Sequence, residues 1–273
     1  MKNITKAVIA ILLVASAGTA AFADDSTQLS KDLSLNVGYK LWLNSWQTTV
    51  ASNHIQGGDH YTAITQGGYG NIPNVSLRYK QAFLSMGYLA SGTYNFPQYT
   101  DVIAVTGLPR LVTNSVSASR NEFDMNLGFM FVPQLGATIG YKNVTQNYQI
   151  SSASPGITFA NNGATTHTYM NGVTFGLTGG APIGGGFTLY GNGVGGFMIV
   201  NYSPSTPTND SATYIASELG IAWRPQRVPL SLSLGYKYQI ISTRVAAANN
   251  AVLNNQVGLD VTNGYVLGAS YSF

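Results

Sequence analysis

The sequence contains no cysteine, and only 8% of its residues are charged. Without cysteine there is no disulfide framework, no thiolate metal site and no cysteine nucleophile. A typical soluble domain carries about 25% charged residues. A disordered chain has fewer aromatic residues than the 17 tyrosines and 11 phenylalanines found here. The sequence also lacks the apolar stretches of roughly 20 residues that a helical membrane protein needs. What remains is a chain rich in glycine and tyrosine, with few charges of either sign.

The first 23 residues have the pattern of a secretory signal peptide. A positively charged start and a short apolar run over 7–15 precede Ala21 and Ala23, which form a small-x-small cleavage site. The alternative, a membrane anchor, needs a longer apolar run. We therefore expect an exported protein with a signal peptide over 1–23 and a single domain over 24–273.

The rest of the chain alternates between apolar and polar residues with a period of two. The even positions from 230 to 240 are Leu, Tyr or Ile, and the odd positions between them are Ser, Gly, Lys or Gln. Successive side chains of a strand point to opposite faces, so these segments are two-sided strands. Glycines weaken the second and seventh strands, which leaves eight or twelve strands as alternatives to ten. The ten predicted strands cover 33–48, 62–79, 82–95, 117–131, 135–150, 167–180, 186–201, 211–224, 229–244 and 255–273.

The predicted connections alternate in length. The short ones lie near 80, 133, 182 and 226, and the long ones cover 49–61, 96–116, 151–166, 202–210 and 245–254. An even number of strands with short turns at one end and long loops at the other is typical of an antiparallel transmembrane β-barrel. A soluble β-sandwich or lipocalin-like barrel would expose its polar face to water and would carry more Lys and Glu. We therefore predict an all-β transmembrane barrel with short periplasmic turns and long outer loops.

The last strand carries a resemblance to a known class of proteins. It ends in Phe273, and Tyr265, Leu267 and Tyr271 share its apolar face. An alternating strand that ends in phenylalanine resembles the C-terminal assembly signal of Gram-negative outer-membrane β-barrel proteins. The resemblance implies recognition by the barrel-assembly machinery and insertion into the outer membrane, beside lipid and lipopolysaccharide. It implies no particular activity.

The polar face of the strands predicts a charged lumen. Asp124 and Lys142 lie at nearly equal distances from the turn near 133, and Glu218 and Lys237 do so around the turn near 226. Neighbouring strands therefore place opposite charges side by side. A barrel of about ten strands is close to the size that side chains fill. We expect a narrow or plugged lumen held by salt bridges, with a solute or ion pathway as the alternative. The lumen charges are Lys40, Arg120, Glu122, Asp124, Lys142, Glu218, Lys237 and Asp260.

Evidence for an enzyme is weak. Of the three histidines, only His60 follows an acid directly, which makes Asp59 and His60 the candidates for a loop-based protease or lipase. Proteases among ten-stranded outer-membrane barrels are similar in strand number, but they use two acidic pairs, which this chain lacks. The flexible loop around His54, Asp59 and His60 offers no fixed metal site.

The leading hypothesis is therefore a non-enzymatic barrel with a role as a narrow channel, a small-solute transporter or a structural or surface protein. We assign no catalytic residue, metal or cofactor. No basic tract of the kind that binds nucleic acid is present. We expect a monomer. A small solute stays open as a binding partner.

Overall fold

The computed structural model describes residues 33–54, 58–105, 108–158, 162–203, 210–225, 228–244 and 257–273. The predicted signal peptide, with Ala21 and Ala23, lies outside these residues. Among the described residues, no helix is long and apolar enough to cross a membrane. The strands are β1 (Leu33–His54), β2 (Gly58–Tyr79), β3 (Ala82–Ser91), β4 (Tyr94–Asn95), β5 (Tyr99–Val105), β6 (Leu108–Val132), β7 (Leu135–Ala153), β8 (Thr165–Gly184), β9 (Phe187–Ser203), β10 (Asp210–Trp223), β11 (Leu230–Arg244) and β12 (Val257–Ser272).

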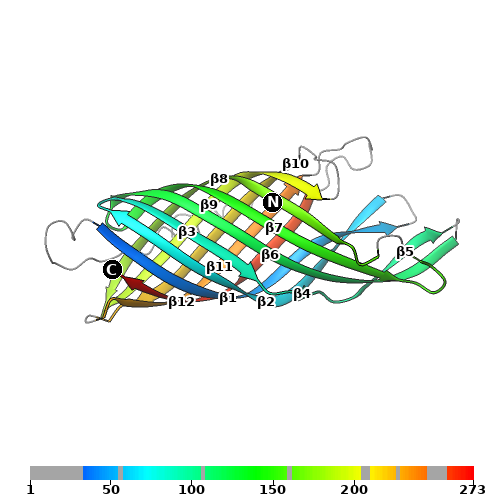
Figure 1. The fold of residues 1–273 in the computed structure, drawn as a ribbon, viewed down its shortest axis with the longest axis horizontal. Helices are drawn as coiled ribbons and strands as arrows, with labels where there is room; N and C mark the ends of the chain where they lie inside the picture. The colour runs from blue at the N-terminus through cyan, green and yellow to red at the C-terminus, as the bar shows by residue number, and fades with distance from the viewer. Residues whose placement is uncertain are drawn as a thin grey trace.

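These twelve strands form one antiparallel sheet, and ten of them close into a ring. Each strand of the ring pairs with its neighbours along the chain, β3 pairs with β6, and β12 closes the ring against β1. The short strands β4 and β5 pair with β6 only. The ring is an elongated barrel (Figure 1). The predicted all-β antiparallel fold is thus confirmed, and the predicted third strand is broken into β3 and β4.

One end of the barrel has short turns, and we call it the short-turn end. The turns lie at 80–81, 133–134 and 185–186. Gly185 and Gly186 have φ angles of 63° and 79°, which a two-residue hairpin turn favours and other residues rarely adopt. The chain also ends here, where the backbone N–H of Phe273 donates to the carbonyl of Leu35 at 2.8 Å.

The other end, which we call the long-strand end, corrects two predictions. Most of the described residues in 49–61 and 96–116, where loops were predicted, lie in strands. β1 runs on to His54 and pairs with β2 from Gly58, and β5 pairs with β6 up to Val105 and Leu108. Each hairpin satisfies its own backbone hydrogen bonds, so it continues where the ring has already ended. The hairpin of β5 and β6 projects from the barrel in Figure 1.

The outer surface carries an apolar belt next to the short-turn end. Every outward position of β6 from 123 to 131 is Phe, Met or Leu, whereas those from 113 to 121 are Thr, Ser or Asn. A tilted strand crosses the hydrocarbon core in about 9–11 residues. Exposed aromatic side chains border the belt on both sides, as in transmembrane barrels. Those farther from the short turns are Tyr39, Tyr69, Tyr88, Tyr141, Tyr236 and Tyr265, and those beside the turns are Tyr79, Phe131, Phe187, Trp223, Tyr271 and Phe273.

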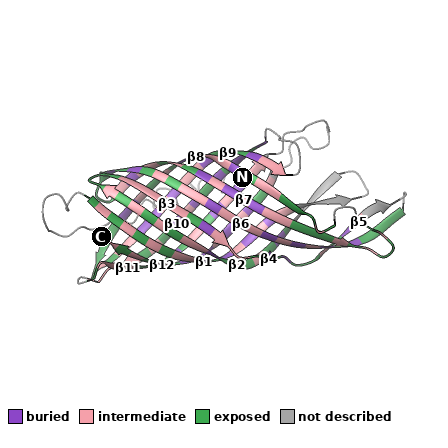
Figure 2. Cartoon of the chain, in the orientation of Figure 1, coloured by how far each residue is buried: buried purple, intermediate pink, exposed green. Residues whose placement is uncertain are grey.

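The glycines that weakened the seventh predicted strand do not interrupt it, since β9 is continuous. A Cβ atom on Gly196 would lie 2.5 Å from the carbonyl oxygen of Val173 and 2.9 Å from Cγ2 of Thr174. The strands β8 and β9 therefore approach too closely there for a side chain. Buried residues are frequent from the middle of the barrel toward the long-strand end, while the short-turn end is mostly exposed or intermediate (Figure 2).

Candidate functional site

The interior of the ring holds the chemically active side chains. All eight charged residues predicted for the lumen lie on its inner face, because each alternates with outward-facing neighbours along its strand. Five of them are buried and three are partly exposed. Two groups of ion pairs and one lysine outside any ion pair account for most of them.

The central group is built around Lys142 on β7. Its Nζ lies 2.5 Å from Oε2 of Glu122 and 2.8 Å from Oδ1 of Asp124, both on β6. Asp124 and Lys142 are direct cross-strand partners, as their distance from the turn predicts. Lys142 and Glu122 have no exposed side-chain surface. A charge buried this deeply is stable only when opposite charges and hydrogen bonds compensate it.

Glu122 connects this group to the opposite wall of the barrel. Its Oε1 lies 2.7 Å from Nε of Arg120 and accepts a hydrogen bond of 3.0 Å from Nε2 of Gln239 on β11. Arg120 in turn donates from Nη1 to Oγ1 of Thr262 on β12 at 3.1 Å. We call Arg120, Glu122, Asp124, Lys142 and Gln239 the lumen network. It crosses the interior from β6 and β7 to β11, and Arg120 extends the connection to β12.

Asp260 lies in an adjoining polar layer. Its carboxylate accepts hydrogen bonds from Nε1 of Trp46 at 3.3 Å and from Nε2 of Gln146 at 3.2 Å. Sequence reasoning missed Trp46, Gln146 and Gln239. Their positions are in phase with the lumen charges on the same strands, and that signal could have found them.

The second group joins Lys40 and Glu218 across the lumen. Nζ of Lys40 lies 2.7 Å from Oε1 of Glu218, which also accepts a hydrogen bond of 3.1 Å from the hydroxyl of Tyr190. The predicted placement of Glu218 beside Lys237 is confirmed, since the two are cross-strand partners in register, but Glu218 forms its ion pair with Lys40. The distance of two residues from a turn predicts which residues are partners on adjacent strands. It does not predict which side chains meet across the lumen.

Lys237 is left with an aromatic contact. Its Nζ lies 4.5 Å from the centre of the Trp42 ring, at cation–π distance. Within the described part of the chain, Lys237 makes no ion pair shorter than 4.0 Å. This lysine is the one lumen cation without a carboxylate partner among those residues.

Toward the long-strand end, aromatic side chains fill the lumen. The Trp46 ring packs edge-on against Tyr94 at 5.1 Å and Phe96 at 5.6 Å, and it contacts Tyr148 at 5.7 Å. We call these four residues the aromatic cluster. The hydroxyl of Tyr94 donates to Oδ1 of Asn44 at 2.7 Å. Side chains therefore fill the lumen between the network and the long-strand end.

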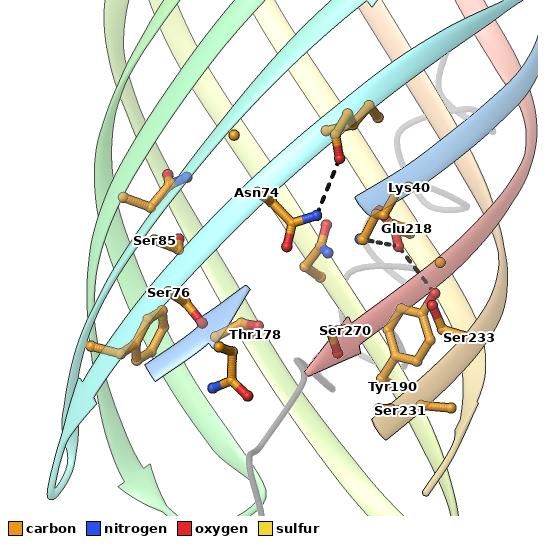
Figure 3. A pocket seen from close by; sticks show the side chains of 18 of the residues that line it. Lys40, Asn74, Ser76, Ser85, Thr178, Tyr190, Glu218, Ser231, Ser233 and Ser270 are labelled. Carbon is orange, nitrogen blue, oxygen red and sulfur yellow. Dashed lines mark hydrogen bonds and ion pairs between the residues drawn. The ribbon is translucent and has the colours of Figure 1, made fainter. Parts of the chain in front are cut away.

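Toward the short-turn end, the lumen contains a cavity of about 370 Å³, which we call the vestibule. Its wall combines Asn, Ser and Thr side chains with apolar ones such as Ile72, Phe83 and Leu177, and it reaches the turns at Arg78 and Arg224. In Figure 3 the linked side chains of Lys40, Glu218 and Tyr190 lie along one wall. Asn74, Ser76 and Ser85 lie across from them. Asp124, Lys40 and Lys237 border the vestibule where the network begins.

The hydrolase candidates receive no support from this geometry. Asp59 and His60 lie on the backbone of β2, and His54 ends β1, but the side chains of all three lie outside the described residues. His167 is at the outer surface, where its Nδ1 lies 2.6 Å from Oδ1 of Asn147. The described residues contain no group of three or more His, Asp or Glu side chains that could hold a metal ion.

The residues of the proposed assembly signal all lie on the outer surface. Tyr265, Leu267, Tyr271 and Phe273 are exposed on β12 and at its end. The rings of Tyr271 and Phe273 contact each other at 4.7 Å. They therefore lie in the apolar belt, beside the short turns.

Comparison with known proteins identifies the fold. No family model matches the chain, and no curated protein matches its sequence. The outer-membrane protease OmpT of Escherichia coli matches with a TM-score of 0.58 and 13% identity, over 93% of this chain and 100% of that one. The translocator domain of the autotransporter NalP of Neisseria meningitidis matches with a TM-score of 0.41 and 13% identity, over 98% of each chain. The likeness to OmpT concerns the fold alone. The chain has the fold of Gram-negative outer-membrane β-barrel proteins, as its alternation and final strand predict.

Proposed function

We propose that this chain is an integral outer-membrane barrel without enzymatic activity, whose lumen is a narrow pathway for small solutes that is closed at rest. The apolar belt with its two aromatic borders supports the membrane location. The predicted signal peptide over 1–23 supports export, and the exposed C-terminal aromatic residues support recognition by the barrel-assembly machinery.

The orientation follows from the same features. The short turns and the chain end face the periplasm, and the long hairpins extend outward. The outward Ser, Thr and Asn side chains of β6 beyond the belt then lie at the level of lipopolysaccharide sugars. The barrel closes on itself through β1 and β12 and acts as a monomer.

The observation that carries the proposal is that the vestibule is closed on its inner side. A vestibule of about 370 Å³ stops at the lumen network, and the aromatic cluster fills the space beyond it. A structural barrel would need no such vestibule, and an open pore would have no such barrier. The arrangement is that of a channel with a closed gate. Glu122 reaches Gln239 on β11 across the lumen, and Lys142 holds Glu122 from the neighbouring strand.

Liposome swelling tests this function. Liposomes that contain the refolded residues 24–273 should not swell in arabinose. The triple variant Glu122→Ser/Lys142→Ser/Trp46→Ala removes one acid and one base, so the lumen keeps its charge balance, and it also removes the central ring of the aromatic cluster. It should admit the sugar.

Lys80→Ser, at a turn outside the lumen, is the control and should behave like the unchanged protein. Swelling by the unchanged protein would contradict the closed lumen. A correctly folded triple variant that admits no sugar would contradict the channel and leave a structural role.

The hydrolase alternative rests only on Asp59 and His60. If the refolded protein cleaves peptides or lipid esters and His60→Ala abolishes the cleavage, the non-enzymatic proposal fails.

A further inference from the structure

We infer that the vestibule binds a small organic anion and that Lys237 is the cation that holds its carboxylate. This deepens the proposed function, because it names the class of solute that enters the pathway. The inference rests on the charges, the polar wall and the shape of the cavity.

The charges bordering the vestibule leave one cation without a partner. Both acids that line it are already bound: Asp124 accepts two contacts from Lys142, at 2.8 and 2.9 Å, and Glu218 binds Lys40 at 2.7 Å. Lys237 lines the same cavity and lies over the Trp42 ring, and among the described residues it forms no ion pair within 4.0 Å. A half-buried ammonium group in a narrow polar lumen attracts an anion more strongly than one at the open surface.

The approach to Lys237 is also cationic. Arg78 and Arg224 line the vestibule near the short turns, and Lys40 lines it deeper inside. Four cationic and two acidic side chains therefore border the cavity. Clefts lined by an excess of one charge concentrate ligands of the opposite charge.

The wall provides hydrogen-bond partners for the rest of a polar solute. Asn74, Asn192, Ser231, Ser233 and Ser270 are spread around the cavity and offer both donors and acceptors. Small-molecule sites typically have volumes of about 300–1,000 Å³. The vestibule, at about 370 Å³, suits a solute of the size of a hydroxylated six-carbon acid.

Two glycines hold the cavity open. A Cβ atom on Gly235 would lie 2.6 Å from the hydroxyl oxygen of Tyr190, and one on Gly220 would lie 2.7 Å from Cζ of the same ring. The ring of Tyr190 therefore lies flat against the wall of β10 and β11, and its hydroxyl reaches Glu218. This position keeps the ring against the wall of the vestibule, and its hydroxyl binds the same Glu218 oxygen that Lys40 contacts.

Calorimetric titration of the refolded protein in neutral detergent at low salt tests the inference. We use gluconate as the probe, with glucose as its uncharged counterpart. Gluconate should bind and glucose should not. Lys237→Met should raise the Kd for gluconate about tenfold, as expected for the loss of one charged hydrogen bond. Glu218→Gln should lower the Kd, because it removes a nearby negative charge and releases Lys40.

A second readout locates the site. In protein labelled with 5-fluorotryptophan, gluconate should shift the resonance of Trp42, which lies under Lys237, and leave that of Trp223 on the outer surface unchanged. Equal binding of glucose, an unchanged Kd in folded Lys237→Met, or no binding by folded protein would each overturn the inference. If Lys237→Met fails to fold, the contrast between gluconate and glucose and the effect of Glu218→Gln decide the question. The swelling assay is independent of these results, so a closed channel that binds no anion is distinguishable from a barrel that is no channel.

Discussion

Nζ of Lys142 lies 2.5 Å from Oε2 of Glu122, and neither side chain has any exposed surface. The contact joins β6 to β7 inside the barrel, and Glu122 also binds Arg120 and Gln239. A lumen held by buried charges responds asymmetrically to substitution. Removing one charge of a buried pair leaves the opposite charge without a partner. Removing both charges of the pair leaves no buried charge that needs one.

Lys142→Met should therefore lower the free energy of unfolding by about 3–5 kcal/mol, the usual cost of breaking a buried pair from one side. Adding Glu122→Gln should recover part of the loss. Urea titration of the refolded barrel in phospholipid vesicles measures both values. Lys80→Met, outside the lumen, is the control and should change stability by no more than about 0.5 kcal/mol. A single variant that behaves like this control would show that the network contributes no stability.

The fold was largely predictable because alternation depends only on local sequence. The strand pattern and the lumen face of Lys142 and Asp124 follow from a period of two, and their pairing follows from the turn between them. The contact of Lys40 with Glu218 joins residues 178 positions apart across the lumen. It depends on the tilt and diameter of the closed ring, which no single strand encodes. The vestibule could not be predicted for the same reason.

The extended hairpins were missed for a different reason. Gly, Asn and Ser residues around 49–61 indicated a loop, yet the backbone there pairs as β1 with β2. Pairing between adjacent segments can override weak local preference, because the hairpin supplies its own hydrogen bonds. The same holds for β5 and β6.

Gly68 should be intolerant of a side chain. An added Cβ would lie 2.4 Å from Cε1 of Tyr94, whose ring packs against Trp46 in the aromatic cluster. Gly68→Ala should cost about 1–3 kcal/mol and alter the near-ultraviolet circular dichroism of the aromatic cluster.

The neighbouring Gly67 provides the matched control. The nearest atom to its added Cβ lies at 3.9 Å, an ordinary contact, so Gly67→Ala should leave the spectrum unchanged. Identical spectra for the two variants would show that Tyr94 does not occupy the lumen at this position.

The membrane boundary can be tested on a single strand. Leu127 lies in the apolar belt of β6 and is 57% exposed, and Ser117 faces outward on the same strand beyond the belt. Leu127→Arg should destabilise the barrel in a bilayer by about 2–4 kcal/mol, whereas Ser117→Arg should cost about 0–1 kcal/mol. Folding titrations in vesicles measure the difference. Equal costs would place the belt elsewhere.

Phe273 should matter for assembly more than for stability. Its ring is 71% exposed, while its backbone N–H bonds to Leu35 regardless of the side chain. Phe273→Ala should reduce the amount of protein in the outer membrane of cells and leave refolding from urea in vesicles unchanged. Normal amounts of the variant in the outer membrane would show that Phe273 is not part of the proposed assembly signal.

Single-channel conductance in a planar lipid bilayer tests the central claim most directly. The refolded protein, shown to be folded by its heat-dependent mobility, should give no discrete current steps, because the lumen network and the aromatic cluster close the pathway. Glu122→Ser/Lys142→Ser/Trp46→Ala should give steps under the same conditions. Stable steps from the unchanged protein, with no further opening in the triple variant, would contradict a lumen closed by the network and the aromatic cluster.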